Sequence, residues 1–327
     1  MATITVDRPN QVANPPVAQS DNTQTAAERQ RELLDGFHRK HLNVRNLDWP
    51  VLLWMVGIHV GAVAALFFFT WQAVVAAVVM HWLTCSIGIC LGYHRYLSHR
   101  SFKLIAPAEY FVTLCGVLSG EGSPLNWAAN HRVHHQRSDQ EGDPHSPTDG
   151  NWWSHMMWVF VKRSPAVRAR LYERYVPDLA YKPMMQFYER TYGYWVVGAA
   201  AAVFGVGTAI GGLYFGLSLF LWAVCFRMAI AYHSTWFVNS ATHIWGYRNY
   251  ETKDLSRNLW WVAVLSYGEG WHNNHHAHPR VAQAGHRWWE LDMTNWVIRA
   301  LKFTGIAREV NDTLPQGKAA AANENDF

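Results

Sequence analysis

Four apolar stretches, each about as long as a membrane is thick, most constrain what this chain can fold into. They cover about residues 49–69, 72–92, 193–212 and 214–236. A helix needs roughly 20 apolar residues to cross a bilayer. The stretches form two pairs, because only "TWQ" near 70–72 and "GGLY" near 211–214 separate the partners. We therefore predict an all-α integral membrane protein with four transmembrane helices in two hairpins.

The lysines and arginines predict the orientation of these helices. Of the 28, six precede residue 49, twelve lie between 93 and 192, nine follow 237 and one, Arg227, lies inside the fourth stretch. Neither short connector contains one. The positive-inside rule then places both termini and the long central loop in the cytoplasm. Arg227 is expected to face the protein interior or to snorkel to the interface, because a charge in lipid is costly.

The polar segments form the rest of the predicted layout. Residues 93–192 and 237–308 are expected to build one cytosolic helical cap, which with the spans makes a single domain over 49–308. Residues 1–27 and 309–327 are too polar to bury a core and are predicted to be disordered tails. Residues 28–48 are charged and helical in pattern, and either lie along the membrane surface or form a solvated helix.

Two shorter apolar runs, 104–120 and 259–268, are too short to span a bilayer. We predict interfacial or re-entrant helices there. The first 48 residues contain no apolar core of a signal peptide. The four cysteines lie inside apolar stretches and form no metal-binding pair. A net charge of +4 without a basic run gives no support for nucleic-acid binding.

Nine of the 18 histidines fall into compact groups beside the ends of the predicted spans. These are His94 and His99 in "HRYLSH", His131, His134 and His135 in "HRVHH", His243 in "NSATH", and His272, His275 and His276 in "HNNHH". Positions i, i+3 and i+4 share a helix face, so each H-x-x-H-H box is expected to direct three imidazoles at one point. His94 and His99 are five apart, which predicts that their box lies where the second span ends or unwinds.

The grouped histidines predict a pair of metal ions, because nine ligands are too many for one. Imidazole suits iron, copper, zinc and nickel. Carboxylates are scarce beside the boxes and thiolates are absent, which argues against calcium, magnesium and a thiolate zinc site. Glu269, Asp139 and Asp143 are candidates to accept the outer N–H of ligating histidines, although surface solvation or a turn at "GDP" would explain them as well.

Histidines outside the boxes are expected to be packed or hydrogen-bonded residues without a metal. This group includes His59, His81, His145, His155 and His233.

At the boxes the chain resembles the membrane fatty-acid desaturase family, and within it the delta-9 type. The resemblance extends from about residue 49 to 308. It depends on "GYHRYLSHRSFK", "HRVHHQRSDQEGDPHSP", "WFVNSATHIWGYRNYE" and "GEGWHNNHHAHP", followed by "RWWELDMTNWVIRALKFTGIA". The boxes alone also fit alkane and sphingolipid hydroxylases, whereas "NSATHIWGYR" and the segment after the last box are specific to delta-9 desaturases.

The resemblance implies a four-helix membrane domain under a cytosolic cap that holds two irons. The nine grouped histidines would be the ligands, and Asn239 of "NSATH" would hold a bound water. The implied reaction uses O2 to place a cis double bond in a saturated long-chain acyl group. Because every methylene is chemically alike, a bent apolar tunnel must select the carbons. Trp127, Tyr232, Trp236 and Trp271 are candidates for that tunnel or for contacts behind the ligands, and membrane-interface aromatics are the alternative.

The chain departs from the animal acyl-CoA enzymes before the second box. They carry Arg-Asp where this chain has Ala129 and Asn130, so a contact for a CoA phosphate is missing and the acyl carrier is either CoA or a membrane glycerolipid. No heme-binding H-P-G-G motif is present, so the expected electron donor is a separate ferredoxin, cytochrome b5 or flavoprotein chain. The alternatives are a di-iron hydroxylase on the same scaffold and, from another class, a polytopic metal transporter.

Overall fold

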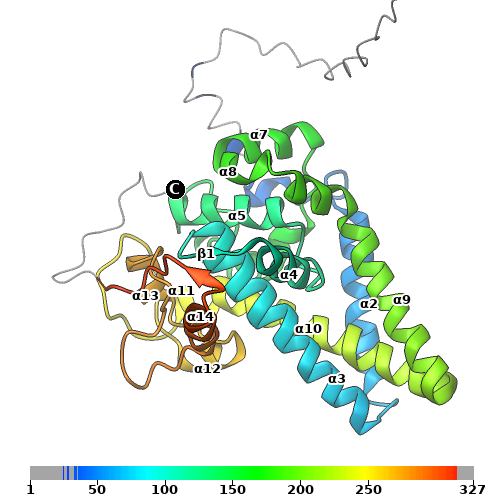
Figure 1. The fold of residues 1–327 in the computed structure, drawn as a ribbon. Coiled ribbons are helices and arrows are strands. Elements are labelled where there is room, and N and C mark those ends of the chain that lie inside the picture. Colours follow the sequence, from blue (N-terminus) through cyan, green and yellow to red (C-terminus); the bar gives the residue numbers. More distant parts are fainter. Residues whose placement is uncertain (1–24, 26–27, 29–32, 35, 315–327) are drawn as a thin grey trace, which may run out of the picture.

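The protein is described by a computed structural model, which covers residues 25, 28, 33–34 and 36–314. The predicted tails lie outside these residues apart from Thr25 and 309–314. The described chain is mainly helical, and its two strands form one short antiparallel pair, β1 (Lys103–Leu104) with β2 (Ala307–Arg308). In Figure 1, long helices extend away from a group of shorter helices that forms the cap.

The extending helices coincide with the four apolar stretches. They are α2 (Trp49–Ala65), α3 (Trp71–His81), α9 (Pro183–Leu219) and α10 (Arg227–Asn239), with the π-helices η2 (Trp82–Ser98) and η5 (Phe220–Phe226) continuing α3 and preceding α10. Two continuous helical runs, Trp71–Ser98 and Pro183–Ile244, are long and apolar enough to cross a membrane, whereas α2 has 17 residues. The described chain is thus a helical protein with apolar helices suited to a membrane.

The run Pro183–Ile244 is bent back on itself rather than straight. Gly211 and Gly212 leave the helical region, and Gly212 has φ 75°, a conformation open to glycine. Behind this turn the two arms approach closely, since a Cβ on Gly207 would lie 2.9 Å from the Cα of Gly216. The predicted connector at 211–214 is therefore the hairpin turn. The first connector is longer than expected, because α2 ends at Ala65 and α3 starts at Trp71.

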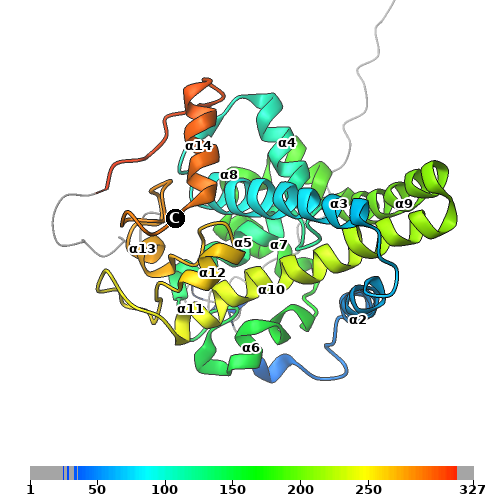
Figure 2. The ribbon, with the colours of Figure 1, turned by 90° about the horizontal axis from the view of Figure 1, so that it is seen from below.

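The remaining helices build the cap. They are η1 (Arg39–His41), α4 (Ala106–Val117), α5 (Pro124–Arg137), η3 (Pro147–Asp149), α6 (Asn151–His155), η4 (Met157–Phe160), α7 (Pro165–Tyr175), α8 (Pro177–Ala180), α11 (Ala241–Ile244), α12 (Trp260–Leu265), α13 (His272–Ala277) and α14 (Met293–Phe303). Figure 2 shows α11, α12 and α13 beside one end of α10, and α4 and α14 on the opposite side of α3.

Local sequence signals explain where two of the cap helices start. Ser123 caps α5 by accepting from Asn126 N at 3.3 Å, and Ser164 caps α7 by accepting from Val167 N at 3.2 Å. In both cases proline occupies the first turn, where its missing N–H costs nothing. The α5 cap fixes the phase of the helix that carries His131, His134 and His135.

Buried polar contacts attach the cap to the apolar helices. Arg227 lies inside α10 and is buried; its Nη1 donates to Thr84 Oγ1 at 3.3 Å and to the carbonyl of Leu118 at 3.2 Å. Arg227 therefore faces the protein interior, which is one of the two positions expected from the sequence. In the 28–48 segment, Leu33, Leu34 and Phe37 are buried in a core with residues of η2, α5 and α9. The described part of that segment thus packs on the cap.

Candidate metal centre

The nine predicted histidines come together as two groups. The five-histidine group is His94, His99, His131, His135 and His275. The four-histidine group is His134, His243, His272 and His276. Within each group the ligand nitrogens lie within 4.8 Å of one another. Neighbouring rings come from histidines as far as 181 residues apart in sequence, such as His94 and His275.

Each H-x-x-H-H box supplies both groups, so the expectation that one box directs three rings at one point is wrong. Consecutive helix positions differ by about 100°, which turns His134 away from His135. In α5 the i, i+4 pair His131 and His135 joins the five-histidine group, and His134 joins the other. The box in α13 does the reverse, since His275 alone joins the five-histidine group. The two groups are therefore interlocked through both helices.

The π-helix η2 places His94 and His99 in the same group. The expected helix end is present, because η2 stops at Ser98 and His99 is its C-cap. The segment does not simply unwind before that end. Its i→i+5 pairing continues to His99, whose N–H donates to His94 O at 3.1 Å, and wider turns bring positions five apart back towards one face. The two rings meet edge to face at 4.8 Å.

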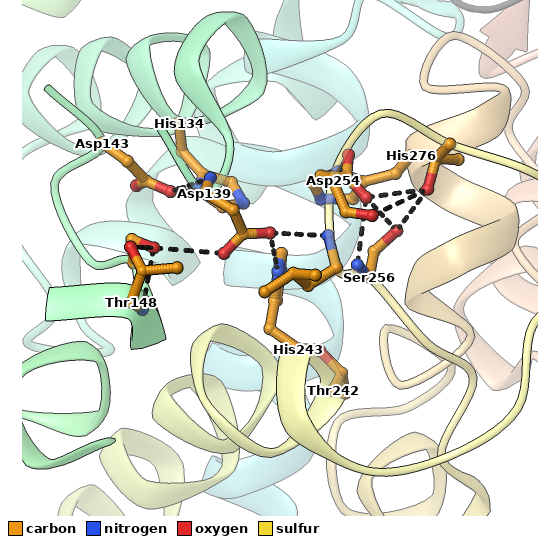
Figure 3. Close-up of polar contacts among 12 residues, drawn as sticks. His134, Asp139, Asp143, Thr148, Thr242, His243, Asp254, Ser256 and His276 are labelled. Carbon is orange, nitrogen blue, oxygen red and sulfur yellow. Dashed lines mark hydrogen bonds and ion pairs between the residues drawn. The ribbon is translucent and has the colours of Figure 1, made fainter. Parts of the chain in front are cut away.

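Four carboxylates contact the outer nitrogens of these histidines. Three were candidates from the sequence: Glu269 Oε2 lies 2.8 Å from His94 Nδ1, Asp143 Oδ1 lies 3.0 Å from His134 Nδ1, and Asp139 Oδ2 lies 2.8 Å from His243 Nδ1. The sequence reading missed Asp254, whose Oδ2 lies 2.7 Å from His276 Nδ1. No local signal marks it, because it precedes that histidine by 22 residues. Figure 3 shows Asp139, Asp143 and Asp254 beside His243, His134 and His276, three members of the four-histidine group.

These contacts determine which nitrogen is left for a metal. A carboxylate at Nδ1 makes that nitrogen the N–H donor, so Nε2 of a neutral ring presents its lone pair. In the four-histidine group, Nε2 of His134, His243, His272 and His276 is buried and has no hydrogen-bond partner. Converging buried lone pairs without donors are costly unless a cation binds them. The donor set therefore fits a metal ion.

The five-histidine group meets the same test through its nitrogen separations. His99 Nε2 lies 2.7 Å from His131 Nε2, and His275 Nε2 lies 3.0 Å from His94 Nε2 and 2.9 Å from His135 Nε2. Metal–imidazole bonds of about 2.1 Å hold neighbouring ligand nitrogens at about this distance. All-nitrogen ligation suits a transition metal.

Burial keeps most of these rings neutral. Burial and the neighbouring imidazoles lower the pKa of His131, His135, His272 and His275 well below the ordinary histidine value. Neutral imidazole is the form that binds metals. Burial alone would raise the pKa of Asp143, but His134 and His145 bring it below its usual value, so this carboxyl is an anion.

His145, expected to be an ordinary packed residue, lies beside the centre. Its ring centroid is 4.3 Å from that of His134, and it groups with His134 and Asp143 as a further potential ligand set. Its spacing within "GDPHSP" gave no helical pattern, so only the folded chain reveals the position.

A cavity of about 520 Å³ reaches the five-histidine group at His131. Its wall includes His131, Trp127, Trp236 and Asn239, and Tyr232 also lines it. Three of the four aromatic candidates are therefore cavity residues. Trp271 is not: it is buried elsewhere and donates from Nε1 to Leu291 O at 2.9 Å. Asn239 ends α10 at the cavity wall.

Glu121 gives this cavity wall a group that titrates near neutrality. Burial raises its pKa to about 7, although Thr235 and Trp127 donate to it at 2.9 and 3.4 Å. Between about pH 5 and 7 the folded chain keeps a proton that the unfolded chain has lost. Stability should therefore fall as pH rises through that window, by on the order of 2 kcal/mol, and level off above it.

Unfolding temperatures measured from pH 5 to 8 test this expectation. Glu121→Gln should remove the decline, because glutamine does not ionise. The exposed Glu251→Gln is the control and should retain it. If the parent and Glu121→Gln have parallel profiles, Glu121 does not titrate in this way.

Asp254 should affect the metal centre through His276. Asn at this position can still accept from Ser256 N, which now donates to Oδ1 at 3.0 Å, but its amide cannot match a carboxylate at His276 Nδ1. Loss of such a partner typically costs about 10- to 100-fold in metal affinity or activity. We expect Asp254→Asn to lose metal faster than Glu251→Gln during dialysis against a chelator. Equal loss from the two variants would show that Asp254 does not orient His276.

Comparisons with known proteins agree with this geometry. Residues 69–307 match the family model described as fatty acid desaturase. The chain is 41% identical to the sn-2 palmitoyl-lipid 9-desaturase of Nostoc sp. (strain 36) over 84% of this chain and 94% of that protein. It is 41% identical to the sn-1 stearoyl-lipid 9-desaturase of Anabaena variabilis over 81% and 94%, and 38% identical to the icosanoyl-CoA 5-desaturase of Limnanthes douglasii over 84% and 75%.

Proposed function

Because the chain belongs to the fatty acid desaturase family, it is an oxidoreductase that desaturates fatty acyl groups, and we propose that it places a cis double bond at carbon 9 of a palmitoyl or stearoyl chain carried by a membrane lipid. The observation that carries this proposal is the pair of interlocked histidine groups, one of which contributes His131 to the wall of a cavity. The 9-position and the lipid carrier follow the names of the two relatives at 41% identity.

We assign two irons to the centre, one to each histidine group. The irons would supply the O2-derived oxidant that removes hydrogen from two adjacent methylenes. Asn239 is assigned to the same centre through a water, in support of which it lies on the cavity wall with His131. Glu269, Asp139, Asp143 and Asp254 hold the rings in the tautomer that leaves Nε2 free.

The remaining work of the chain is to position the acyl group and to exclude water. Trp127, Tyr232 and Trp236 supply apolar walls to the cavity. An alkyl chain has no polar group near carbon 9, so the shape of such walls is the available means of fixing which carbons approach the centre. A dry site also protects a reactive oxidant from side reactions.

A lipid carrier fits the residues at the second box. Ala129 is buried, and Asn130 accepts from Arg163 Nη1 at 2.6 Å, so this position holds an internal contact in place of the Arg-Asp pair of animal acyl-CoA enzymes. The CoA relative shows that the alternative carrier occurs among similar proteins. We therefore make the carrier an explicit readout of the test below.

We further propose four membrane spans with both termini and the metal centre on the cytoplasmic side. The hairpin turn at Gly211–Gly212 supports two spans in the run Pro183–Ile244. Outward-facing apolar side chains on the shorter α2, such as Val56 and Val60, support a third span, and the run Trp71–Ser98 supports the fourth. Electrons would come from a separate donor, either a ferredoxin, cytochrome b5 or a flavoprotein chain.

Expression in a host that lacks delta-9 desaturation tests the proposed function. We expect fatty acid analysis by mass spectrometry to show new monounsaturated chains with the double bond at carbon 9, and positional analysis to find them first in intact glycerolipids. Only hydroxylated chains would support the hydroxylase alternative. Unaltered acyl chains from folded, iron-loaded protein would defeat the proposal. New monounsaturated chains that appear first in acyl-CoA would overturn the proposal that a membrane lipid is the carrier.

A further inference from the structure

Within the described part of the chain, the outward face of helix α14 belongs neither to the metal centre nor to the cavity. It spans Met293–Phe303 and is the last helix of the cap. Trp296 is 55% exposed and Phe303 is 93% exposed. They are seven positions apart and therefore lie on the same helix face. Such large apolar side chains in water at one face mark an interaction surface.

The opposite face of α14 packs against η2 and α4. Ile298 is fully buried in a core with Ile87 and Leu91 of η2 and Val112 of α4. Thr294 Oγ1 donates to the carbonyl of Tyr267 at 2.9 Å. Packing of this buried face fixes the orientation of α14, and that orientation leaves Trp296 and Phe303 exposed.

The strand pair β1–β2 joins α14 to α4. β1 leads into α4, β2 follows α14, and Leu104 pairs with Ala307. Figures 1 and 2 both place α4 and α14 near the cap end of the α3–η2 rod. On α4, Tyr110 and Phe111 are more than half exposed. The two helices joined by this strand pair therefore both carry exposed aromatic side chains.

Both ionisable side chains of α14 itself are cationic. Within α14 the ionisable residues are Arg299 and Lys302, both exposed. The two acids just before the helix, Glu290 and Asp292, are turned inward and are 4% and 3% exposed. Asp292 is held by Arg95 at 2.9 Å, and Glu290 accepts from Asn274 Nδ2 at 2.7 Å. Lys302, in the last turn of the helix, pairs with the exposed Asp312 beyond it, whereas Arg299 lies one turn earlier.

We propose that α14 lies in the surface of an anionic phospholipid bilayer, with Trp296 and Phe303 inserted at the boundary of headgroups and acyl chains and Arg299 at the headgroups. An amphipathic helix with aromatic anchors and flanking cations has the properties of an interfacial helix. This placement does not depend on the desaturase reaction, although it requires the apolar helices to be embedded.

Site-directed spin labelling of the full chain in nanodiscs tests the proposal. Trp296→Cys and Phe303→Cys carry the label, Val60→Cys on α2 marks the lipid interior, and Glu251→Cys in a cap loop marks water. The parent chain is the blank, because its four cysteines are buried. Collision with O2 reports lipid, and collision with a water-soluble nickel chelate reports solvent.

We expect the ratio of O2 to nickel collision at positions 296 and 303 to exceed that at 251 severalfold and to stay below that at 60. Replacing part of the phosphatidylcholine by phosphatidylglycerol should deepen the label at 296. Arg299→Gln should remove that deepening, and Arg299→Lys should retain it.

Three results would overturn the proposal. Ratios at 296 and 303 equal to that at 251 would place α14 in water. Labels shielded from both reagents would mean that a second copy of the chain or another protein covers the face. A water-like ratio at 60 would remove the proposed membrane placement of the whole chain and this inference with it, whereas loss of desaturation with normal ratios would affect only the proposed reaction.

Discussion

His134→Ala is expected to abolish desaturation and to lower the iron content of the purified chain. His134 is fully buried, its Nδ1 is held by Asp143, and its Nε2 has no hydrogen-bond partner. A direct ligand should matter more than an orienting carboxylate, whose loss costs about 10- to 100-fold. We therefore expect a decrease in activity of more than about 100-fold.

Iron counted per chain and acyl products measured on the same preparation test this expectation. The parent should carry about two irons, one for each histidine group. The variant should lose mainly the iron of the four-histidine group, and the exposed His38→Ala is the matched control. The amount of folded protein in the membrane should be unchanged. Near-normal turnover by His134→Ala would refute its assignment as a ligand.

The largest loss of stability is expected for Arg95→Met. Arg95 is buried between two carboxylates: its Nη2 lies 3.0 Å from Glu269 Oε1 and its Nη1 lies 2.9 Å from Asp292 Oδ2. Its Nη1 also donates to the carbonyl of Ala282 at 2.6 Å. Methionine would leave two buried anions without a counter-charge, and breaking a buried ion pair costs about 3–5 kcal/mol. The free energy of unfolding should fall by about that amount.

Thermal unfolding of the purified chain checks this expectation. Arg308→Met, at an exposed arginine, should change the unfolding temperature little. Arg95→Met combined with Asp292→Asn should recover part of the loss, because one of the uncompensated charges is gone. If Arg95→Met unfolds at the temperature of Arg308→Met, the ion-pair cluster does not stabilise the fold. Glu269 also contacts His94, so Arg95→Met should bind metal more weakly as well.

Much of the fold could be predicted because it follows from local periodicity and length. The apolar stretches correspond to α2, α3 with η2, α9 and α10, since helices satisfy their own backbone hydrogen bonds in lipid. The ends were less predictable. α2 stops at Ala65 although apolar residues continue to Phe69, and the π winding of η2 was not predicted from the sequence.

The site was predictable in membership but not in partition. The i, i+3, i+4 spacing identified the six histidines of the two H-x-x-H-H boxes, and position beside the ends of the predicted spans identified His94, His99 and His243. The phase of α5 and α13 relative to each other decided that His134 and His275 cross to the opposite groups. Asp254 and His145 were missed for a related reason. Their partners are side chains brought close by loops, and loop conformation is not encoded in a short periodic pattern.

The sequence by itself determined which segments are apolar enough for a membrane, which histidines are grouped and which family the chain resembles. These are properties of composition and of spacing along the chain. Only the tertiary structure decided how the rings are shared between two groups, which carboxylates orient them and which aromatics reach the cavity. Those outcomes depend on the angles at which separate helices meet, and the packing of residues far apart in sequence sets those angles.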